Sequence, residues 1–477
     1  MAPDIKPDRV SLHRSIPSVS SLLSHPDLVQ LASTQSPTII TRSARAVLGE
    51  LRESFSLPHK STTSPAIEEL VARVLERVKL AAEPTLHSAI NATGIVLHTG
   101  LGRSRLHWSA VQAVTSVGTY HSILEVEPET GGRGSRQSHV SGLLCELTGA
   151  EAASVVNNCA GAVLLAVTAL AAGKEVILSR GEMVEIGGAF RMPDIIKACG
   201  AKLVEVGTTN RTRITDYSRA ITDQTGLILR CHPSNFRIVG FTESAASEQL
   251  VALGRKHNIP VMEDQGSGAI IDPVSLGLSR HHGSLPHSVE DGFDVITASG
   301  DKLMGGPQAG ILLGSRTSID AVMSHPLARA VRIDKLTLAG LEATLRIYRD
   351  PARAVNEIPT LRYLSRTAPD IKSTAQTLCE ALRKSIPADR FSISVVEECS
   401  QAGGGSLPGD DLPTFCVEIQ SSSTTDSVDG IARVMRGGMP PVFGRIRDDA
   451  YLLDPRTMEH FEIDIVARVA RALADAD

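Results

Sequence analysis

The chain has 477 residues, 42% of them hydrophobic, and a formal net charge of −5, which suits two or three domains with substantial cores and excludes nonspecific nucleic-acid binding driven by overall charge. It contains neither an uncharged apolar run of about 18 residues nor a secretory leader pattern, so we expect a cytoplasmic protein without a membrane span. Its seven scattered cysteines form no Cys-x-x-Cys pair, which predicts reduced, mostly structural thiols and no metal site.

The first predicted region, residues 1–85, is helical. Apolar residues recur at a period of about 3.6 residues in two stretches, 44–51 and 67–78, which the breaker-rich residues 57–65 separate. Basic side chains accompany this pattern, namely Arg42, Arg45, Arg52, His59 and Lys60. Taken alone, such residues are more typical of a solvated helix face than of a nucleic-acid contact.

Residues 86–350 alternate short apolar runs with helical stretches, a pattern typical of an α/β domain whose mostly parallel central sheet is covered on both faces. The predicted strands are 153–156, 176–178, 203–206, 227–229, 261–263, 295–297 and 311–313. Residues 351–477 predict a smaller α/β domain, with a helix over 374–382, strands over 392–396 and 415–419, and a closing helix over 463–474.

A phosphate site is expected after the first of these strands. Residues 157–161 are predicted as a turn that leads into an apolar helix over 162–171. The free N–H groups at the start of a helix bind phosphate, although an Asn-rich turn that only caps a buried helix has the same pattern. The candidate ligands are Asn157, Asn158, Cys159 and Ala160.

The most informative residue is Lys302, which lies in a Gly-rich segment between strand-like runs. A lysine at a strand end can hold an aldehyde cofactor through its amine, but this segment alone fits a surface loop equally simply. Asp264 ends another strand at the edge where open α/β sheets bind ligands. A carboxylate there suits the protonated ring nitrogen of pyridoxal phosphate (PLP). The chain order Asn157, Asp264, Lys302 is that of fold-type I PLP enzymes.

Polar residues at two further strand ends extend the expected cofactor site. His232, Ser234 and Asn235 follow the strand that ends at residue 231, and Ser299 precedes the lysine segment. Their position favours contact with the cofactor ring or its oxygen. The alternative for the first group is a turn in which Ser and Asn bond the backbone.

The longer motifs around these residues carry a resemblance to one family. They comprise residues 90–99, 129–136, 179–188, 205–211, 232–241, 299–310, 332–336, 403–408 and 440–445. In these segments, which span nearly the whole chain, the sequence resembles bacterial selenocysteine synthase, the L-seryl-tRNA(Sec) selenium transferase family. Motifs of this number and length are far more specific than a single Gly pattern.

The resemblance implies a function. A member of this family converts L-seryl-tRNA(Sec) to L-selenocysteinyl-tRNA(Sec) with PLP, by β-elimination of the serine hydroxyl to an aminoacrylyl intermediate and addition of selenium from selenophosphate. It implies that Lys302 holds PLP and takes the α-proton, that Asp264 keeps the pyridine nitrogen protonated, and that the N-terminal region docks the tRNA. It also implies a homo-oligomer, most typically a decamer, with sites between paired subunits.

Residue-by-residue comparison with the family places Arg103, Arg329 and Arg332 in the pocket for selenophosphate, where forked guanidinium donors match phosphate oxygens. Without the resemblance, Arg329 and Arg332 are better interpreted as a surface pair on one helix face. Two positions depart from the usual family pattern: Gly100 stands where Asn is common, and Cys159 where a third Asn is usual. Both lie near expected sites, so they bear on substrate choice more than on the fold.

Two other functions compete with this interpretation. One is a related PLP-dependent lyase or aldolase that acts on a small amino acid or amino sugar. The N-terminal helical region favours the transferase, because a tRNA-charged substrate needs a docking region that a small-molecule enzyme can lack. The other is a catalytically silent RNA-binding scaffold, against which the intact Lys302 and Asp264 argue.

Overall fold

The computed structural model describes residues 15–56, 65–186, 190–233, 236–278, 283–403, 411–422 and 427–475. The chain divides into two compact units, residues 1–88 and 89–477. Within the described ranges, none of the helices is both long enough and apolar enough to span a bilayer.

The first unit is built from four described helices around one apolar core. The sequence predicts two of them, and the structure adds two short ones that carry too few residues for a periodic signal. Leu28, Leu48, Leu70 and Val74 meet in the core. The helices are α2 (Val19–Leu23), α3 (Pro26–Leu31), α4 (Pro37–Ser56) and α5 (Ile67–Ala82).

The second unit contains a seven-stranded sheet in the order β2-β10-β9-β8-β7-β3-β6. Neighbouring strands from β9 to β6 are parallel, whereas β10 runs antiparallel to both β9 and β2. The mostly parallel sheet is thus confirmed, with one reversed strand. The strands are β2 (Ala152–Val156), β3 (Glu175–Ser179), β6 (Lys202–Val206), β7 (Thr225–Cys231), β8 (Val261–Gly266), β9 (Val295–Ser299) and β10 (Gly310–Gly314).

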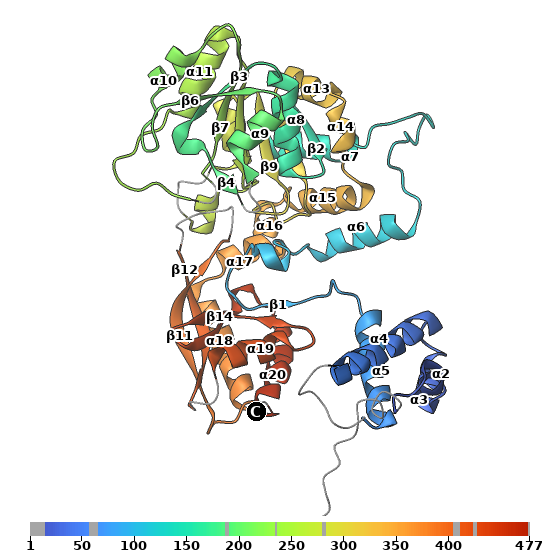
Figure 1. The fold of residues 1–477 in the computed structure, drawn as a ribbon. Helices are drawn as coiled ribbons and strands as arrows, with labels where there is room; N and C mark the ends of the chain where they lie inside the picture. Colours follow the sequence, from blue (N-terminus) through green and yellow to red (C-terminus); the bar gives the residue numbers. More distant parts are fainter. Residues whose placement is uncertain are drawn as a thin grey trace, which may run out of the picture. The chain divides into compact units, whose positions relative to one another are not determined.

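Successive residues of these strands face two separate cores, which explains why the central strands are mostly apolar. Ile228 packs into one core and Leu229 into the other. Helices cover both faces of the sheet (Figure 1). One face carries α7 (Ser138–Thr148), α11 (Ser247–His257), α12 (Leu285–Asp291) and α15 (Lys335–Ile347), and the other carries α8 (Cys159–Ala171), α9 (Met192–Ala198) and α13 (Arg316–Ser324).

The C-terminal part of this unit has a four-stranded antiparallel sheet in the order β11-β12-β15-β14. Its elements include β11 (Phe391–Gln401), β12 (Asp411–Ser421), β14 (Arg445–Arg447), β15 (Ala450–Leu453), α18 (Ala368–Arg383), α19 (Val428–Arg436) and α20 (Glu462–Ala470). Strand β1 (Ile90–Asn91) pairs with β13 (Val442–Phe443). The start of the second unit therefore packs with the C-terminal part, although the sequence boundaries place it in the cofactor domain.

Strand β10 approaches the start of α8 so closely that only glycine fits at residue 310. A Cβ atom there would lie 2.2 Å from the carbonyl oxygen of Asn158. We expect Gly310→Ala to shift that backbone and to lower the free energy of unfolding by about 1–3 kcal/mol, measured by urea denaturation. The control is Gly142→Ala within α7, where nothing lies within 4 Å of the new atom, which we expect to be neutral or stabilising by up to about 1 kcal/mol. Equal changes in the free energy of unfolding of the two variants would contradict a close approach of β10 to Asn158.

Candidate active site

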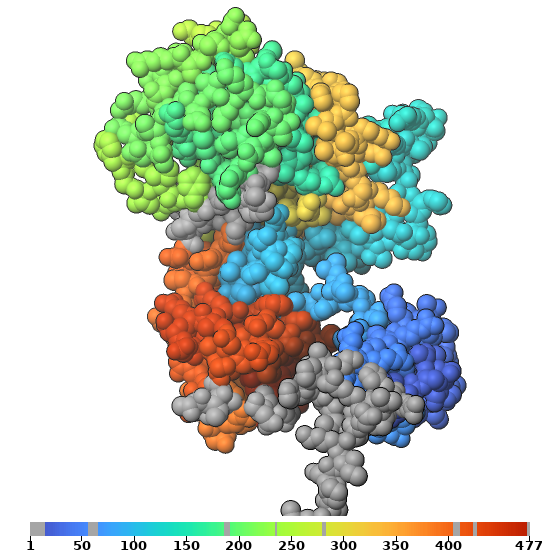
Figure 2. All heavy atoms as spheres, viewed as in Figure 1, coloured from blue at the N-terminus to red at the C-terminus, as the bar shows by residue number. Residues whose placement is uncertain are grey.

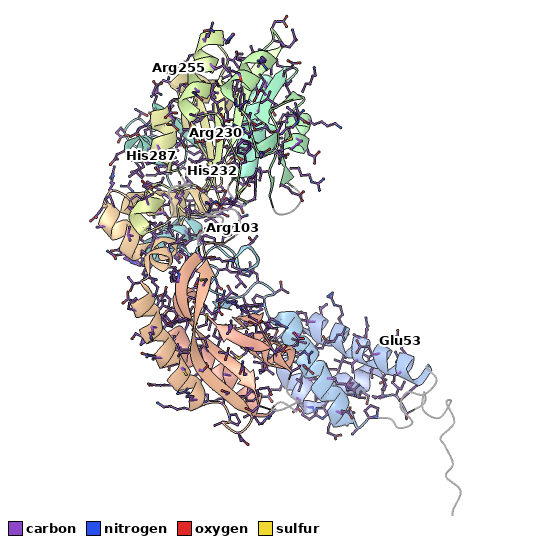
Figure 3. All side chains as sticks on the ribbon, turned by 90° about the vertical axis from the view of Figure 1, so that its left-hand side faces the viewer. Glu53, Arg103, Arg230, His232, Arg255 and His287 are labelled. Carbon is purple, nitrogen blue, oxygen red and sulfur yellow. The ribbon has the colours of Figure 1, made fainter. Side chains whose placement is uncertain are left out.

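Three of the expected site residues lie at the carboxyl ends of β7, β8 and β9, at one edge of the sheet. They are His232, Asp264 and Ser299. Asp264 pairs in register with Cys231 of β7 and with Thr297 of β9. The backbone N–H of His232 donates to the carbonyl oxygen of Asp264 at 3.0 Å. In Figure 3, Arg230, His232 and Arg103 follow one another from the sheet toward the C-terminal part.

Lys302 is buried, with 4% of its surface exposed, in a tight loop after β9. Backbone hydrogen bonds close the loop: the N–H of Gly300 donates to Ala309 O, and that of Gly306 to Gly300 O, each at 2.9 Å. A Cβ on Gly300 would come within 2.7 Å of the carbonyl oxygen of Pro307. The glycines of this segment thus fix the backbone that carries Lys302, which a solvated surface loop does not require.

Asp264 is a buried carboxylate, 5% exposed, held by two neighbours. Its Oδ1 accepts a hydrogen bond from the Thr297 hydroxyl at 2.8 Å and from the Cys159 thiol at 3.7 Å. Burial raises the pKa of Asp264, while Thr297 and the charge of Lys302 act in the opposite direction. Burial also raises the pKa of Cys159, so this thiol stays protonated and serves as a donor. A cation next to the carboxylate would keep Asp264 ionised.

Helix α8 begins earlier than the sequence predicts. The side chain of Asn158 caps it by accepting the N–H of Gly161 at 2.8 Å, so the predicted turn over 157–161 is wrong from Cys159 onward. Cys159 and Ala160 form the first helical turn, and their N–H groups make no hydrogen bond to any residue that the structure describes. Such free N–H groups at a helix start can bind a phosphate.

These residues fit PLP. The cofactor needs an amine for its aldehyde, a carboxylate for its ring nitrogen and donors for its phosphate, and Lys302, Asp264 and the α8 start provide them. Ser299 is buried at the end of β9, three residues before Lys302. Ser234 and Asn235 lie outside the described residues.

The three candidate arginines fall in two places within one chain. Arg103 donates to Asp301 Oδ2 at 2.7 Å, directly beside Lys302. Arg329 lies on the short helix α14 (Leu327–Ala330) and Arg332 lies beyond its end, so the alternative of a pair on one helix face is wrong. Both line a cavity of about 300 Å³ that Arg103 does not line.

Positive charge is concentrated in this second cavity. Its lining also includes Arg133, Arg136 and Glu125. Glu125 pairs with Arg136 at 2.7 Å and with Arg332 at 3.5 Å. Desolvation and the charges of Arg136 and Arg329 lower the pKa of Arg332. One carboxylate among four arginines leaves a net cationic pocket suited to an anion.

The overall architecture is that of the fold-type I PLP-dependent enzymes. A solved structure of D-glucosaminate-6-phosphate ammonia-lyase matches it with a TM-score of 0.56 at 20% sequence identity, covering 87% of this chain and 99% of that one. This likeness concerns the fold alone.

The family follows from two sequence comparisons. Residues 89–459 match the family described as L-seryl-tRNA selenium transferase, and residues 14–52 match the family described as selenocysteine synthase N terminal. The L-seryl-tRNA(Sec) selenium transferase of Geotalea daltonii is 46% identical over 467 residues, 97% of this chain and 100% of that protein. That of Moorella thermoacetica is also 46% identical, over 98% of this chain and 97% of that protein. The chain belongs to the L-seryl-tRNA selenium transferase family, as the motifs indicated, and its cofactor is PLP.

Proposed function

We propose that this chain converts L-seryl-tRNA(Sec) to L-selenocysteinyl-tRNA(Sec) with selenophosphate at the sheet edge that carries Lys302 and Asp264. The observation that carries the proposal is the meeting of a buried lysine loop, a buried carboxylate and the open start of α8. Family membership supports the same reaction. In the balance of this reaction, the seryl group loses its α-proton and β-hydroxyl as water. The selenium of selenophosphate then bonds to the β-carbon, a proton returns to the α-carbon, and water cleaves the P–Se bond to release phosphate.

Each residue of the edge has a defined task. Bound PLP supplies an electron sink for the charge that develops at the α-carbon. Lys302 would hold the aldehyde end of the cofactor, and its Nζ would take the α-proton of the substrate. The Asp264 carboxylate, oriented by the Thr297 hydroxyl, keeps the ring nitrogen protonated. The N–H groups of Cys159 and Ala160 would bind the cofactor phosphate, and His232 and Ser299, at the ends of β7 and β9, would contact the cofactor ring or its oxygen.

Replacing Lys302 and replacing Asp264 should have different effects on cofactor linkage and turnover. We expect borohydride reduction of the wild-type protein to fix the cofactor on Lys302, and Lys302→Ala to lose both this link and turnover. Asp264→Ala should keep some lysine-linked cofactor and lose most activity, because the ring nitrogen loses its charge partner. Peptide mapping and a turnover assay measure these outcomes. Lys202→Ala, which removes an exposed lysine of the same sheet, is the control. A cofactor mapped to another lysine would refute the assignment.

We propose that Arg103, Arg329 and Arg332 bind the selenophosphate. The cationic cavity around Arg332 and the position of Arg103 beside Lys302 support this role. Because the three do not line one cavity within a chain, we propose that they meet across a subunit interface of a homo-oligomer, most typically a decamer in this family.

Replacing Arg332 by Gln tests the donor site. We expect the KM for selenophosphate to rise a few tens-fold, about 2 kcal/mol, because one charge-assisted contact is lost. Elimination of the serine hydroxyl should survive, since it precedes attack by the donor. The two half-reactions are assayed separately, with Arg346→Gln on exposed α15 surface as the matched control. Failed elimination with an unchanged KM for the donor would place these arginines at the tRNA ester or the cofactor instead.

We propose that the N-terminal unit docks the tRNA. Arg42, Arg45 and Arg52 are exposed on α4 and lie on one helix face, opposite its buried residues. His59 and Lys60 lie outside the described residues. The acidic net charge of the whole chain makes such a local basic face necessary.

Deleting residues 1–88 tests this docking role. The second unit keeps β1, both sheets and their cores, so we expect its cofactor absorbance to be unchanged. Affinity for seryl-tRNA should fall, and the steep salt dependence of binding by the full chain should flatten, because phosphate contacts release counterions. An unchanged affinity for seryl-tRNA in the truncated protein would overturn the proposal.

A further inference from the structure

A second large cavity lies on the same sheet edge as Lys302 and Asp264. It encloses about 540 Å³ and is lined by residues that follow the ends of β3, β6 and β7, in the green part of the molecule in Figure 2. His232 lines it, and the backbone N–H of the same residue donates to the carbonyl oxygen of Asp264. The cavity therefore adjoins the cofactor residues. No role has so far been assigned to this cavity.

The chemistry of the substrate requires space for a nucleoside near the reacting serine. In an aminoacyl-tRNA the amino acid is esterified to the ribose of the 3′-terminal adenosine. When the serine reaches Lys302, that adenosine is only one ester bond away. It must then occupy space adjoining the sheet edge. A cavity of this volume falls in the range of about 300–1,000 Å³ that is typical of small-ligand sites.

Arg211 gives the cavity a flat, fixed surface. It lines the cavity, and its guanidinium lies 4.2 Å from the centre of the Phe241 ring. Its Nε donates to Glu243 Oε2 at 3.1 Å, and its Nη2 donates to the same oxygen. The guanidinium thus lies over the Phe241 ring, and Glu243 accepts hydrogen bonds from two of its nitrogens. A guanidinium held in this way is suited to stacking on a nucleobase, as Arg planes do in RNA recognition.

The Phe241 segment is itself held in place. The Asn210 side-chain amide donates to the carbonyl oxygen of Phe241 at 2.6 Å, and the Glu243 N–H donates to Asn210 O at 2.9 Å. The Phe241 side chain is nonetheless 75% exposed. Arg237, also exposed, lines the cavity and pairs with none of the carboxylates that the structure describes. Its charge suits the phosphodiester that precedes the terminal nucleoside.

The cavity wall nearest β7 offers an acceptor. Glu182 lines the cavity, and its Oε2 accepts the N–H of Cys231 at 3.1 Å. Its Oε1 makes no hydrogen bond to a described residue. This oxygen can accept a hydrogen bond from a ribose hydroxyl, because a carboxylate oxygen accepts from hydroxyl groups as well as from backbone N–H groups.

We propose that this cavity binds the 3′-terminal adenosine of the seryl-tRNA, with the adenine stacked on Arg211 and the preceding phosphate near Arg237. The proposal rests on the function proposed above. The terminal adenosine would then be a second part of the substrate, besides the serine, that binds at this sheet edge.

The test compares two probes on the full-length, PLP-loaded protein. One is 3′-deoxy-3′-(serylamino)adenosine, whose amide resists hydrolysis, and the other is the same serylamino ribose without its base. The ratio of their dissociation constants, from equilibrium dialysis, isolates the contribution of the base. We expect the wild-type protein to bind the adenosine probe about tenfold more tightly, the scale of one stacked base.

Variants of two neighbouring arginines separate stacking from ion pairing. Arg211→Ala and Arg211→Lys should both reduce the ratio to about one, because lysine keeps the charge and loses the plane. Arg213→Ala is the matched control: Arg213 donates to the same Glu243 oxygen at 3.2 Å but does not line the cavity, so the ratio should stay near tenfold. If Arg211→Ala fails to fold, judged by its lysine-linked cofactor, Arg211→Lys decides.

Two results would overturn the inference: a wild-type ratio near one, or a ratio that the Arg211 variants leave unchanged. Turnover of seryl-tRNA by the wild-type protein together with either result would refute the cavity assignment alone. A wild-type protein that prefers the adenosine probe through Arg211 but forms no selenocysteinyl-tRNA would refute the proposed function and support an adenosine site.

Discussion

The buried carboxylate of Asp264 is the constraint on which this site depends. It stands at the end of a strand whose neighbours are apolar on both faces, and an ionised carboxyl group in such surroundings is costly unless it has a cationic partner and donors. Thr297 and Cys159 supply donors from β9 and α8. Lys302 and the protonated ring nitrogen of the cofactor would supply the positive charge. One charge thereby couples two strands, a helix start and the lysine loop.

The chain must also receive several anions despite its net charge of −5. It can bind them because donors and basic side chains are concentrated in a few places. The start of α8 offers free N–H groups, the Arg332 cavity collects four arginines against one carboxylate, and α4 presents an exposed basic face. The close approach of β10 to Asn158, which only Gly310 permits, holds the start of α8 next to the carboxylate. With the roles proposed above, attraction for phosphate is confined to these three places.

Much of the fold was predictable because it depends on local pattern. Apolar runs located every strand of the large sheet, and the lysine and family motifs indicated the fold-type I architecture and the transferase family, which are confirmed. The start of α8 was misplaced because the sequence does not reveal which Asn side chain caps the helix. The roles assigned to Lys302, Asp264 and the arginines stay predictions. Thr297 was missed because its contact with Asp264 depends on strand order, and the Arg103–Asp301 pair because the partners lie 198 residues apart. The Arg211 cavity was missed for the same reason, although Glu182, Arg211 and Arg237 fell within the family motifs.

The most direct test of this account is incubation of the full-length, PLP-loaded protein with selenium-labelled selenophosphate and either seryl-tRNA(Sec) or free serine. The assay follows the label into aminoacyl-tRNA or into free amino acid. We expect labelled selenocysteinyl-tRNA and no labelled amino acid from free serine, because the reaction requires a substrate anchored by its tRNA. Efficient reaction of free serine with no labelled tRNA would contradict it and would identify a small-molecule lyase instead.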